Sequence, residues 1–212
     1  MKQKQSSYYN NKNINKNFQK NDKQQYLNIP EKYLNLLPKE QKKWPSFSAL
    51  SNYILLSVPL DNFCYTDKID GLHIHLLIFE KKIYNVSNTE NILLIENIEK
   101  MNFNGDCIIE AEFYNKCYYI FDVYYLNGVD YSDKYIYERI GSIKQYMNEL
   151  GPSFKIKNYN KIPDLNFLLE YIKKDKSPEG NDIDGVILQR IDKPYFQNNL
   201  KEFFAFKLKP PH

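Results

Sequence analysis

Apolar side chains alternate with other side chains along much of the chain after residue 52, and this pattern predicts a succession of β-strands. In the clearest run, apolar residues stand at every second position from Leu72 to Ile78, as in a strand with one buried face. Asn115 and Lys116 are expected to turn a hairpin, because asparagine tolerates the backbone dihedrals of a tight turn. The other predicted strands cover 82–86, 92–95, 107–113, 117–125, 184–190 and 203–208.

A helical pattern follows the hairpin. Apolar residues recur three and four positions apart from Ile136 to Leu150, which places them on one face of a helix. Asp130 or Ser132 is the expected N-cap, and the glycine–proline pair after Leu150 is the expected stop. We therefore predict a single helix over this stretch.

Two further helices and a polar arm complete the predicted organisation. Leucines at helical spacing predict a helix over 163–173, and a short amphipathic helix is expected over 30–38. Residues 1–25 are mostly Lys, Asn, Gln and Ser, a composition that favours a mobile polar arm. Residues 26–212 then form one antiparallel-sheet-rich α+β domain, a usual length for a single domain.

Composition limits the chemistry that this domain can perform. Hydrophobic residues make up 42% of the 212 residues and aromatic residues 16%, enough for a sizeable core. The formal net charge is only +3, so bulk charge does not indicate a nucleic-acid-binding protein. Arg139 and Arg190 are the only arginines. Lysine-centred chemistry is therefore favoured over bidentate recognition by arginine.

The three cysteines, Cys64, Cys107 and Cys117, are odd in number and lack a C-x-x-C spacing. This argues against a disulfide framework or a zinc site, and buried, apolar cysteines are expected instead. No apolar run approaches the roughly 20 residues of a membrane span, and the N-terminus lacks the pattern of a secretory signal. We expect no membrane partner and a cytoplasmic location, with a viral factory, a virion or the nucleus left open.

Four stretches interrupt the apolar pattern with charged residues at the starts or on the faces of strands. They are Thr66–Gly71, Ile109–Phe113, Asp182–Ile187 and Phe206–Pro210. Two carboxylates at Glu110 and Glu112 would share one face of a strand and would repel each other without water, lysine or a metal nearby. Each stretch alone is common, but a lysine, carboxylates and two further lysines in this order indicate a phosphoryl-transfer site.

In this order the stretches resemble the motifs of the covalent nucleotidyltransferase superfamily, which contains mRNA capping guanylyltransferases and ATP-dependent ligases. Lys68–Gly71 resembles motif I, K-x-D-G, and Glu110–Glu112 resembles motif III, D-G-E. Tyr118–Gly128 is similar to motif IIIa, Asp184–Ile187 to motif IV and Lys207–Pro210 to motif V. The resemblance implies an ATP-grasp-like ligase and capping-enzyme domain, with the C-terminal OB-fold of relatives absent from this chain.

The spelling of the motifs is closest to that of the guanylyltransferases. Asp184 in motif IV and Pro210 after motif V follow the capping-enzyme pattern. Three residues depart from the family: Ala111 replaces glycine, Leu208 replaces tryptophan, and His73 stands where many relatives have arginine.

The resemblance implies a mechanism for an mRNA guanylyltransferase. Lys68 would attack the α-phosphate of GTP and form a lysyl–GMP phosphoramidate, and the GMP would pass to the 5′-diphosphate end of RNA. A lysine is a nucleophile only when neutral, and neighbouring cations favour that form. Lys207 and Lys209 would stabilise charge on the phosphate. Glu112 and Asp184 would hold Mg²⁺ or Mn²⁺, which prefer oxygen ligands.

Five residues are expected to bind the nucleotide. Thr66, two residues before the nucleophile, could meet a base edge. Gly71 would let the backbone approach closely, and Asp70 belongs to the same motif. Glu110 is expected to contact the ribose or a lysine of the motifs. Phe121 could stack on guanine, although a core position is an equally good interpretation.

Two other pairs carry weaker expectations. His73 and His75 could form a metal pair, but no third ligand is evident, so an exposed or cleft-lining face is the better interpretation. Asp122 would point away from Phe121, and Arg139 is expected to be structural.

The expected partners are GTP, the 5′ end of RNA, and an OB-fold domain or other capping subunits in cis or in trans. Without a lid the chain should bind GTP weakly and react slowly, because lid closure completes such sites. Two alternatives remain open: an ATP-dependent DNA or RNA ligase adenylation domain that forms Lys68–AMP, and a catalytically silent scaffold of the same fold.

Overall fold

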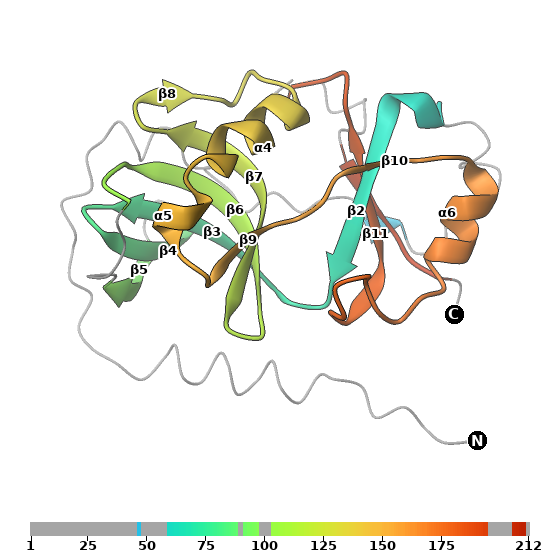
Figure 1. Cartoon of the computed structure of the whole chain (residues 1–212), viewed down its shortest axis with the longest axis horizontal. Coiled ribbons are helices and arrows are strands. Elements are labelled where there is room, and N and C mark those ends of the chain that lie inside the picture. Colours follow the sequence, from blue (N-terminus) through green and yellow to red (C-terminus); the bar gives the residue numbers. More distant parts are fainter. Residues whose placement is uncertain (1–45, 48–58, 89–90, 98–102, 195–204, 211–212) are drawn as a thin grey trace.

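The chain forms two β-sheets that lie side by side, with helices packed against them (Figure 1). The computed structural model describes residues 46–47, 59–88, 91–97, 103–194 and 205–210. Sheet A has the order β1-β12-β11-β2-β10, and sheet B has the order β5-β4-β3-β6-β7-β8, with β9 beside β7. The described part is therefore an antiparallel-rich α+β fold, as predicted.

The strand bounds are as follows. Sheet A contains β1 (Ser46–Phe47), β2 (Phe63–Ile69), β10 (Asn160–Lys161), β11 (Ile183–Arg190) and β12 (Ala205–Leu208). Sheet B contains β3 (Leu72–Phe79), β4 (Lys82–Asn88), β5 (Asn91–Asn97), β6 (Cys107–Tyr114), β7 (Cys117–Leu126) and β8 (Val129–Asp130), with β9 at Phe154–Ile156. A single 3₁₀ turn at Leu60–Asn62 precedes β2.

The predicted strands match β3 to β7 of sheet B, whereas β8 and β9 were not predicted. In β3, Ile74, Leu76 and Ile78 are each at most 2% exposed and belong to one core with apolar residues of β6 and β7. Asn115 and Lys116 turn the β6–β7 hairpin with positive φ values of 48° and 62°. These predicted strands and this turn are confirmed.

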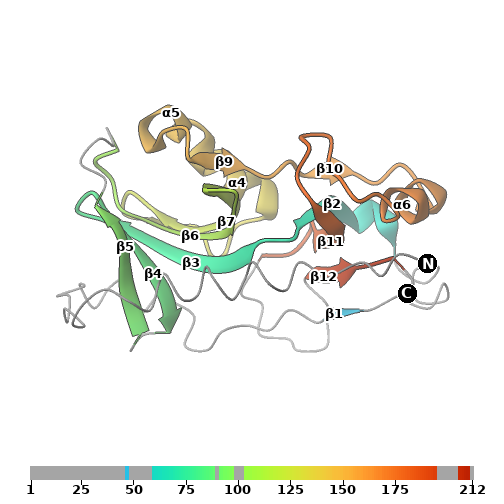
Figure 2. The same cartoon turned by 90° about the horizontal axis from the view of Figure 1, so that it is seen from below.

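Helices α4 (Ile136–Lys144) and α5 (Met147–Leu150) lie against sheet B (Figure 2). The prediction of one continuous helix was wrong, because Tyr146 leaves the helical region with φ −97° and ψ 1°. The predicted N-cap was also wrong. The α4 helix begins after Tyr135, whose backbone N–H donates to the Glu138 carboxylate. Asp130 accepts a hydrogen bond from the backbone N–H of Ser132 within the preceding loop.

Helix α6 (Leu165–Tyr171) covers sheet A. The Asp164 carboxylate accepts the Phe167 N–H at 2.8 Å, which caps the helix. Leu168 and Tyr171 pack against Tyr65 and its neighbours in the core of sheet A. The helix predicted over 163–173 is thus present with shorter bounds.

Some predicted features lie outside the described residues. The polar arm at 1–25, the helix at 30–38 and the first residues of the strand at 203–208 belong to this group. No helix in the described ranges has both the length and the apolar character needed to cross a bilayer.

Candidate active site

Lys68 and Asp184 meet between neighbouring strands of sheet A. Lys68 near the end of β2 donates to Asp184 Oδ1, and Lys209 donates to Asp184 Oδ2 at 2.6 Å. The β2–β11 register shifts between Ile183 and Val186, and such a bulge re-aims side chains. One carboxylate therefore receives two ammonium groups from different strands.

Gly185 allows this arrangement. Its φ is +127°, and a Cβ there would lie 2.1 Å from the carbonyl oxygen of Leu208 and 3.1 Å from the Cα of Lys209. Glycine alone tolerates both this φ and this approach. The end of β12 can therefore reach β11 closely enough for Lys209 to contact Asp184.

Lys207 brings a third ammonium group to the same place. Burial lowers its pKa, and the positive charges of Lys68 and Lys209 lower it further, although Glu112 and Asp184 oppose this effect. For Asp184, burial raises the pKa, but the hydrogen bonds from Lys209 and Lys68 outweigh burial, and the net pKa lies below 3.8. Asp184 is therefore ionised at neutral pH.

The carboxylate of Glu112 interacts electrostatically with Lys207. It is held by Lys157, a residue that the sequence analysis missed. Lys157, only 4% exposed, donates to Glu112 Oε2 at 2.5 Å and to the carbonyl oxygen of Asp67 at 3.2 Å. The backbone N–H of Gly71 donates to Glu112 Oε1 at 3.2 Å. A lone lysine between two short strands carries no sequence signal, so only the fold reveals it.

Gly71 itself has a steric reason to be glycine. An added Cβ would lie 2.8 Å from Glu112 Cγ and 2.8 Å from the carbonyl oxygen of Phe113. The β2–β3 turn therefore packs directly on β6, and this contact holds Glu112 next to the strand that carries Lys68. Asp70, beside it, is exposed, and its backbone N–H donates to the carbonyl oxygen of Asp182.

Two buried polar residues face the same side of sheet A as Lys68. Thr66 lies two residues before Lys68 and is paired with Ile187, so Gln189 is its diagonal neighbour on that face. Thr66 is 1% exposed and Gln189 is 0% exposed. Among the residues that the structure describes, neither the Thr66 hydroxyl nor either atom of the Gln189 amide has a hydrogen-bond partner. The sequence analysis named Thr66 and missed Gln189.

Glu110 contacts a histidine of the neighbouring strand. Glu110 Oε1 lies 2.7 Å from His75 Nε2. His75 is 3% exposed, so the prediction of an exposed or cleft-lining face was wrong for this residue. Phe121 is also buried, and its ring centroid lies 5.2 Å from that of His73 and 5.3 Å from Lys157 Nζ.

Asp122 and Arg139 form a separate, fully buried ion pair. Arg139 Nε donates to Asp122 Oδ1 at 2.6 Å, and Nη2 donates to Oδ2 at 3.0 Å. Burial opposes the charge of Arg139, but the Asp122 carboxylate outweighs burial and raises the pKa of the guanidinium. This bidentate pair joins α4 to β7 and has a structural role, as expected for Arg139.

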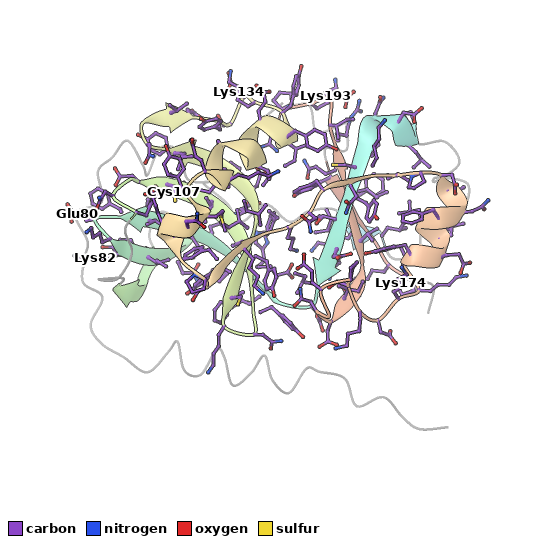
Figure 3. The ribbon with its side chains drawn as sticks, viewed as in Figure 1. Glu80, Lys82, Cys107, Lys134, Lys174 and Lys193 are labelled. Atoms are coloured by element: carbon purple, nitrogen blue, oxygen red, sulfur yellow. The ribbon has the colours of Figure 1, made fainter. Side chains whose placement is uncertain are left out.

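Lys134 lies away from the charges around Lys68 and Asp184. It stands at the upper edge of the molecule in Figure 3, and its side chain is 45% exposed. It provides a reference position for lysine substitutions.

Two solved structures share this fold. Mycobacterial DNA ligase D complexed with ATP and MES has a TM-score of 0.56 at 13% identity, over 84% of this chain and 61% of that chain. The fold is that of a DNA ligase nucleotidyltransferase domain. The ligase domain of LigD from M. tuberculosis gives a TM-score of 0.50 at 13% identity, over 69% of this chain and 53% of that chain. This chain thus spans little more than half the length of each ligase structure. No protein-family model and no curated protein matches it.

Proposed function

We propose that this protein is a covalent nucleotidyltransferase in which Lys68 carries the nucleotide. The observation that carries the proposal is the meeting of Lys68, Asp184 and Lys209 in one hydrogen-bonded group. The motif order from Lys68 to Pro210 and the ligase fold support the same conclusion.

The proposed first step is an exchange at the α-phosphorus of a nucleoside triphosphate. The neutral Nζ of Lys68 attacks, a P–N bond forms, and the bond to the bridging oxygen of the β-phosphate breaks, so that pyrophosphate leaves. The proton displaced from the nitrogen passes to solvent. The lysyl phosphoramidate then passes the nucleoside monophosphate to a terminal phosphate of a polynucleotide. The pairing with Asp184 positions the amine before the triphosphate arrives.

Lys207 and Lys209 provide the positive charge that such a reaction requires. A transferring phosphoryl group gathers negative charge, and ammonium groups already in place stabilise it without reorganisation. Lys209 would exchange its contact with Asp184 for a phosphate oxygen. Burial and the neighbouring cations disfavour the charged form of Lys207. A bound phosphate would stabilise this charge.

A divalent cation fits this site only together with the nucleotide. Both oxygens of Glu112 accept hydrogen bonds from Lys157 and Gly71, and both oxygens of Asp184 accept from lysines. Mg²⁺ commonly binds one or two carboxylates together with substrate phosphates. Asp184 would contribute an oxygen to Mg²⁺ or Mn²⁺ after Lys68 or Lys209 turns to the phosphates, and the ion would neutralise phosphate charge.

ATP is the first candidate nucleotide, with adenylation of Lys68 as in a polynucleotide ligase. Two solved structures with this fold are a DNA ligase and a ligase domain, and the DNA ligase is complexed with ATP. This favours the ligase alternative over the guanylyltransferase prediction. The acceptor would be a 5′-phosphate end of DNA or RNA, and an OB-fold domain supplied in cis or in trans would close over it.

GTP is the second candidate, because specific residues favour it. Asp184-Gly185 in motif IV and Pro210 after motif V follow the guanylyltransferase pattern, although Leu208 departs from it. In that case the acceptor would be the 5′-diphosphate end of RNA. The Thr66 hydroxyl and the Gln189 amide do not discriminate by themselves, since each offers both a donor and an acceptor.

The test is covalent labelling with α-³²P-ATP and α-³²P-GTP, with Mg²⁺ or Mn²⁺. The proposal expects one nucleotide to leave label on the protein that withstands alkali and is released by acid, as a P–N bond requires. Lys68→Ala should abolish the label, and Lys209→Ala should reduce its rate by about 100-fold. Lys134→Ala, at the exposed reference position, should label like the wild type.

Two results would contradict the proposal. One is undiminished labelling of Lys68→Ala, and the other is the absence of label with either nucleotide after an OB-fold domain from a ligase or capping enzyme is added. The second result would favour the catalytically silent scaffold.

A further inference from the structure

The pairing of β3 with β6 brings two imidazoles and one carboxylate to a single point. His73 and His75 share a face of β3, and the register places His75 opposite Glu110. Glu110 Oε1 lies 2.7 Å from His75 Nε2 and 3.9 Å from His73 Nε2. One ligand atom from each of the three residues lies within 4.8 Å of the other two.

We propose that His73, His75 and Glu110 form a binding site for a first-row transition-metal ion such as Zn²⁺ or Co²⁺. Two imidazole nitrogens and one carboxylate oxygen are a donor set that these ions accept, whereas Mg²⁺ prefers oxygen alone. Three protein ligands leave at least one coordination position for water or another ligand.

The distances suit an ion of this size. Metal–ligand bonds of about 2.0–2.1 Å in a tetrahedron place the ligand atoms about 3.4 Å apart. The two distances from Glu110 Oε1 fall on either side of that value. Shifts of about 0.5–0.7 Å would bring both Glu110 distances to that value. The two imidazole nitrogens lie within 4.8 Å of each other, and side-chain rotation would bring them closer.

Burial and charge give the site a second basis. Glu110 is 1% exposed and His75 is 3% exposed, and a carboxylate at such depth is costly unless a cation accompanies it. A divalent ion would balance the charge of Glu110 more fully than the two imidazoles and the Tyr124 hydroxyl beside it. The His73 side chain is 34% exposed although its Nε2 atom is buried, so rotation of this ring would give the ion a route from solvent.

The neighbouring residues hold the His73 ring in position. Its centroid lies 5.0 Å from the ring of His75 and 5.2 Å from the ring of Phe121. Glu112, the partner of His73 in the register, already binds Lys157 and Gly71. The proposed ion therefore lies on the same face as Glu112 but uses different ligands, and its binding requires no nucleotide.

The experiment measures binding of Zn²⁺ and Co²⁺ to the full chain after treatment with a chelator and without nucleotide. We expect one ion per chain by calorimetry, together with Co²⁺ absorption bands of a site with nitrogen and oxygen ligands. His75→Ala and Glu110→Gln should each weaken binding at least 10-fold, because each removes one of three ligands. His212→Ala and Glu80→Gln serve as matched controls and should bind like the wild type.

His73→Asn guards against misfolding, since it changes the most exposed ligand and leaves the buried pair intact. It should fold with an unchanged circular dichroism spectrum and still lose at least 10-fold in affinity. Failure of the wild type to bind either ion overturns the proposal, as does undiminished binding by folded His73→Asn. Loss of binding in His212→Ala alone would also overturn it. Labelling of Lys68 is measured separately, so either proposal can fail alone.

Discussion

The positive charge of Lys207 is disfavoured in the folded protein. Burial and the adjacent cations lower its pKa from 10.5, so the folded chain holds this proton less tightly than the unfolded chain. The free energy of unfolding should therefore rise with pH from the lowered pKa up to 10.5. Lys207→Met should remove this rise and increase the free energy of unfolding at neutral pH.

Urea unfolding between about pH 7 and pH 10 measures this slope. Lys134→Met, at the exposed reference position, should keep the wild-type dependence. Parallel curves for the wild type and Lys207→Met would show that Lys207 does not carry the effect.

Gln189 offers a second test at the scale of one side chain. Its amide is fully buried and has no hydrogen-bond partner among the described residues. An unsatisfied buried donor or acceptor costs about 1–3 kcal/mol, so Gln189→Met should raise the free energy of unfolding by a similar amount. If the amide meets the base of a bound nucleotide, the same variant should also bind nucleotide more weakly. Gln145→Met, at an exposed position, should change neither quantity, and a destabilised Gln189→Met would contradict the argument.

At the scale of elements, the contact of β11 with β12 depends on Gly185. A side chain there would collide with the backbone of Leu208 at a positive φ, so Gly185→Ala should lower the free energy of unfolding by about 3 kcal/mol or more. It should also move Lys209 from Asp184 and slow labelling. Gly141→Ala is the matched control, because a Cβ at this position in α4 meets nothing within 4 Å. That change should stabilise the helix by about 0.5–1 kcal/mol, and equal effects of the two changes would refute the steric account.

The attachment of α4 to β7 rests on Arg139. Removing one partner of a buried ion pair costs about 3–5 kcal/mol, so Arg139→Met should lower the free energy of unfolding by that amount. The double variant Arg139→Met with Asp122→Leu should recover much of the loss. Arg190→Met, which breaks the more exposed contact with Asp192, should cost about 1 kcal/mol or less. Chemical denaturation measures all three, and similar losses for both single arginine variants would contradict the assignment.

The sequence predicted elements better than it predicted their partners. Alternation gave β3, β6 and β7, because one face of each strand packs into the core. It missed the break at Tyr146, since apolar spacing continues unchanged through it. It also left His73 and His75 without a third ligand, because Glu110 joins them only through the register of β3 with β6.

In the candidate site, too, the sequence predicted some residues and missed others. The order of the motifs identified Lys68, Asp184, Lys207 and Lys209. The fold brings these residues together, because β2, β11 and β12 are neighbours in sheet A. Lys157 and Gln189 were not predicted, because neither belongs to a motif. Only the structure shows that both are buried beside these residues.

At the scale of the whole molecule, apolar and polar contacts both join the two sheets. Cys64 of β2 packs against Ile136 and Ile140 of α4, the helix that lies on sheet B. The core of sheet A includes Tyr119 of β7, whose hydroxyl also donates to Asn181 at 2.9 Å. Tyr114 of β6 donates to Asp182 at 2.5 Å. The Lys157 ammonium donates both to Glu112 of sheet B and to the carbonyl oxygen of Asp67 in sheet A. The residues that carry the proposed chemistry therefore depend on how firmly the sheets are held together.

Lys157→Met should weaken this connection without emptying either core. The buried Glu112 loses its cation, so the free energy of unfolding should fall by about 3–5 kcal/mol. Amide hydrogens of β2 and β11 should then exchange at free energies that differ from those of β3 and β6, because the sheets open as separate units. Lys134→Met, at the exposed reference position, should leave exchange uniform. Equal exchange in both sheets of a destabilised Lys157→Met would mean that the apolar contacts of Tyr119 and Cys64 couple the sheets without this ion pair.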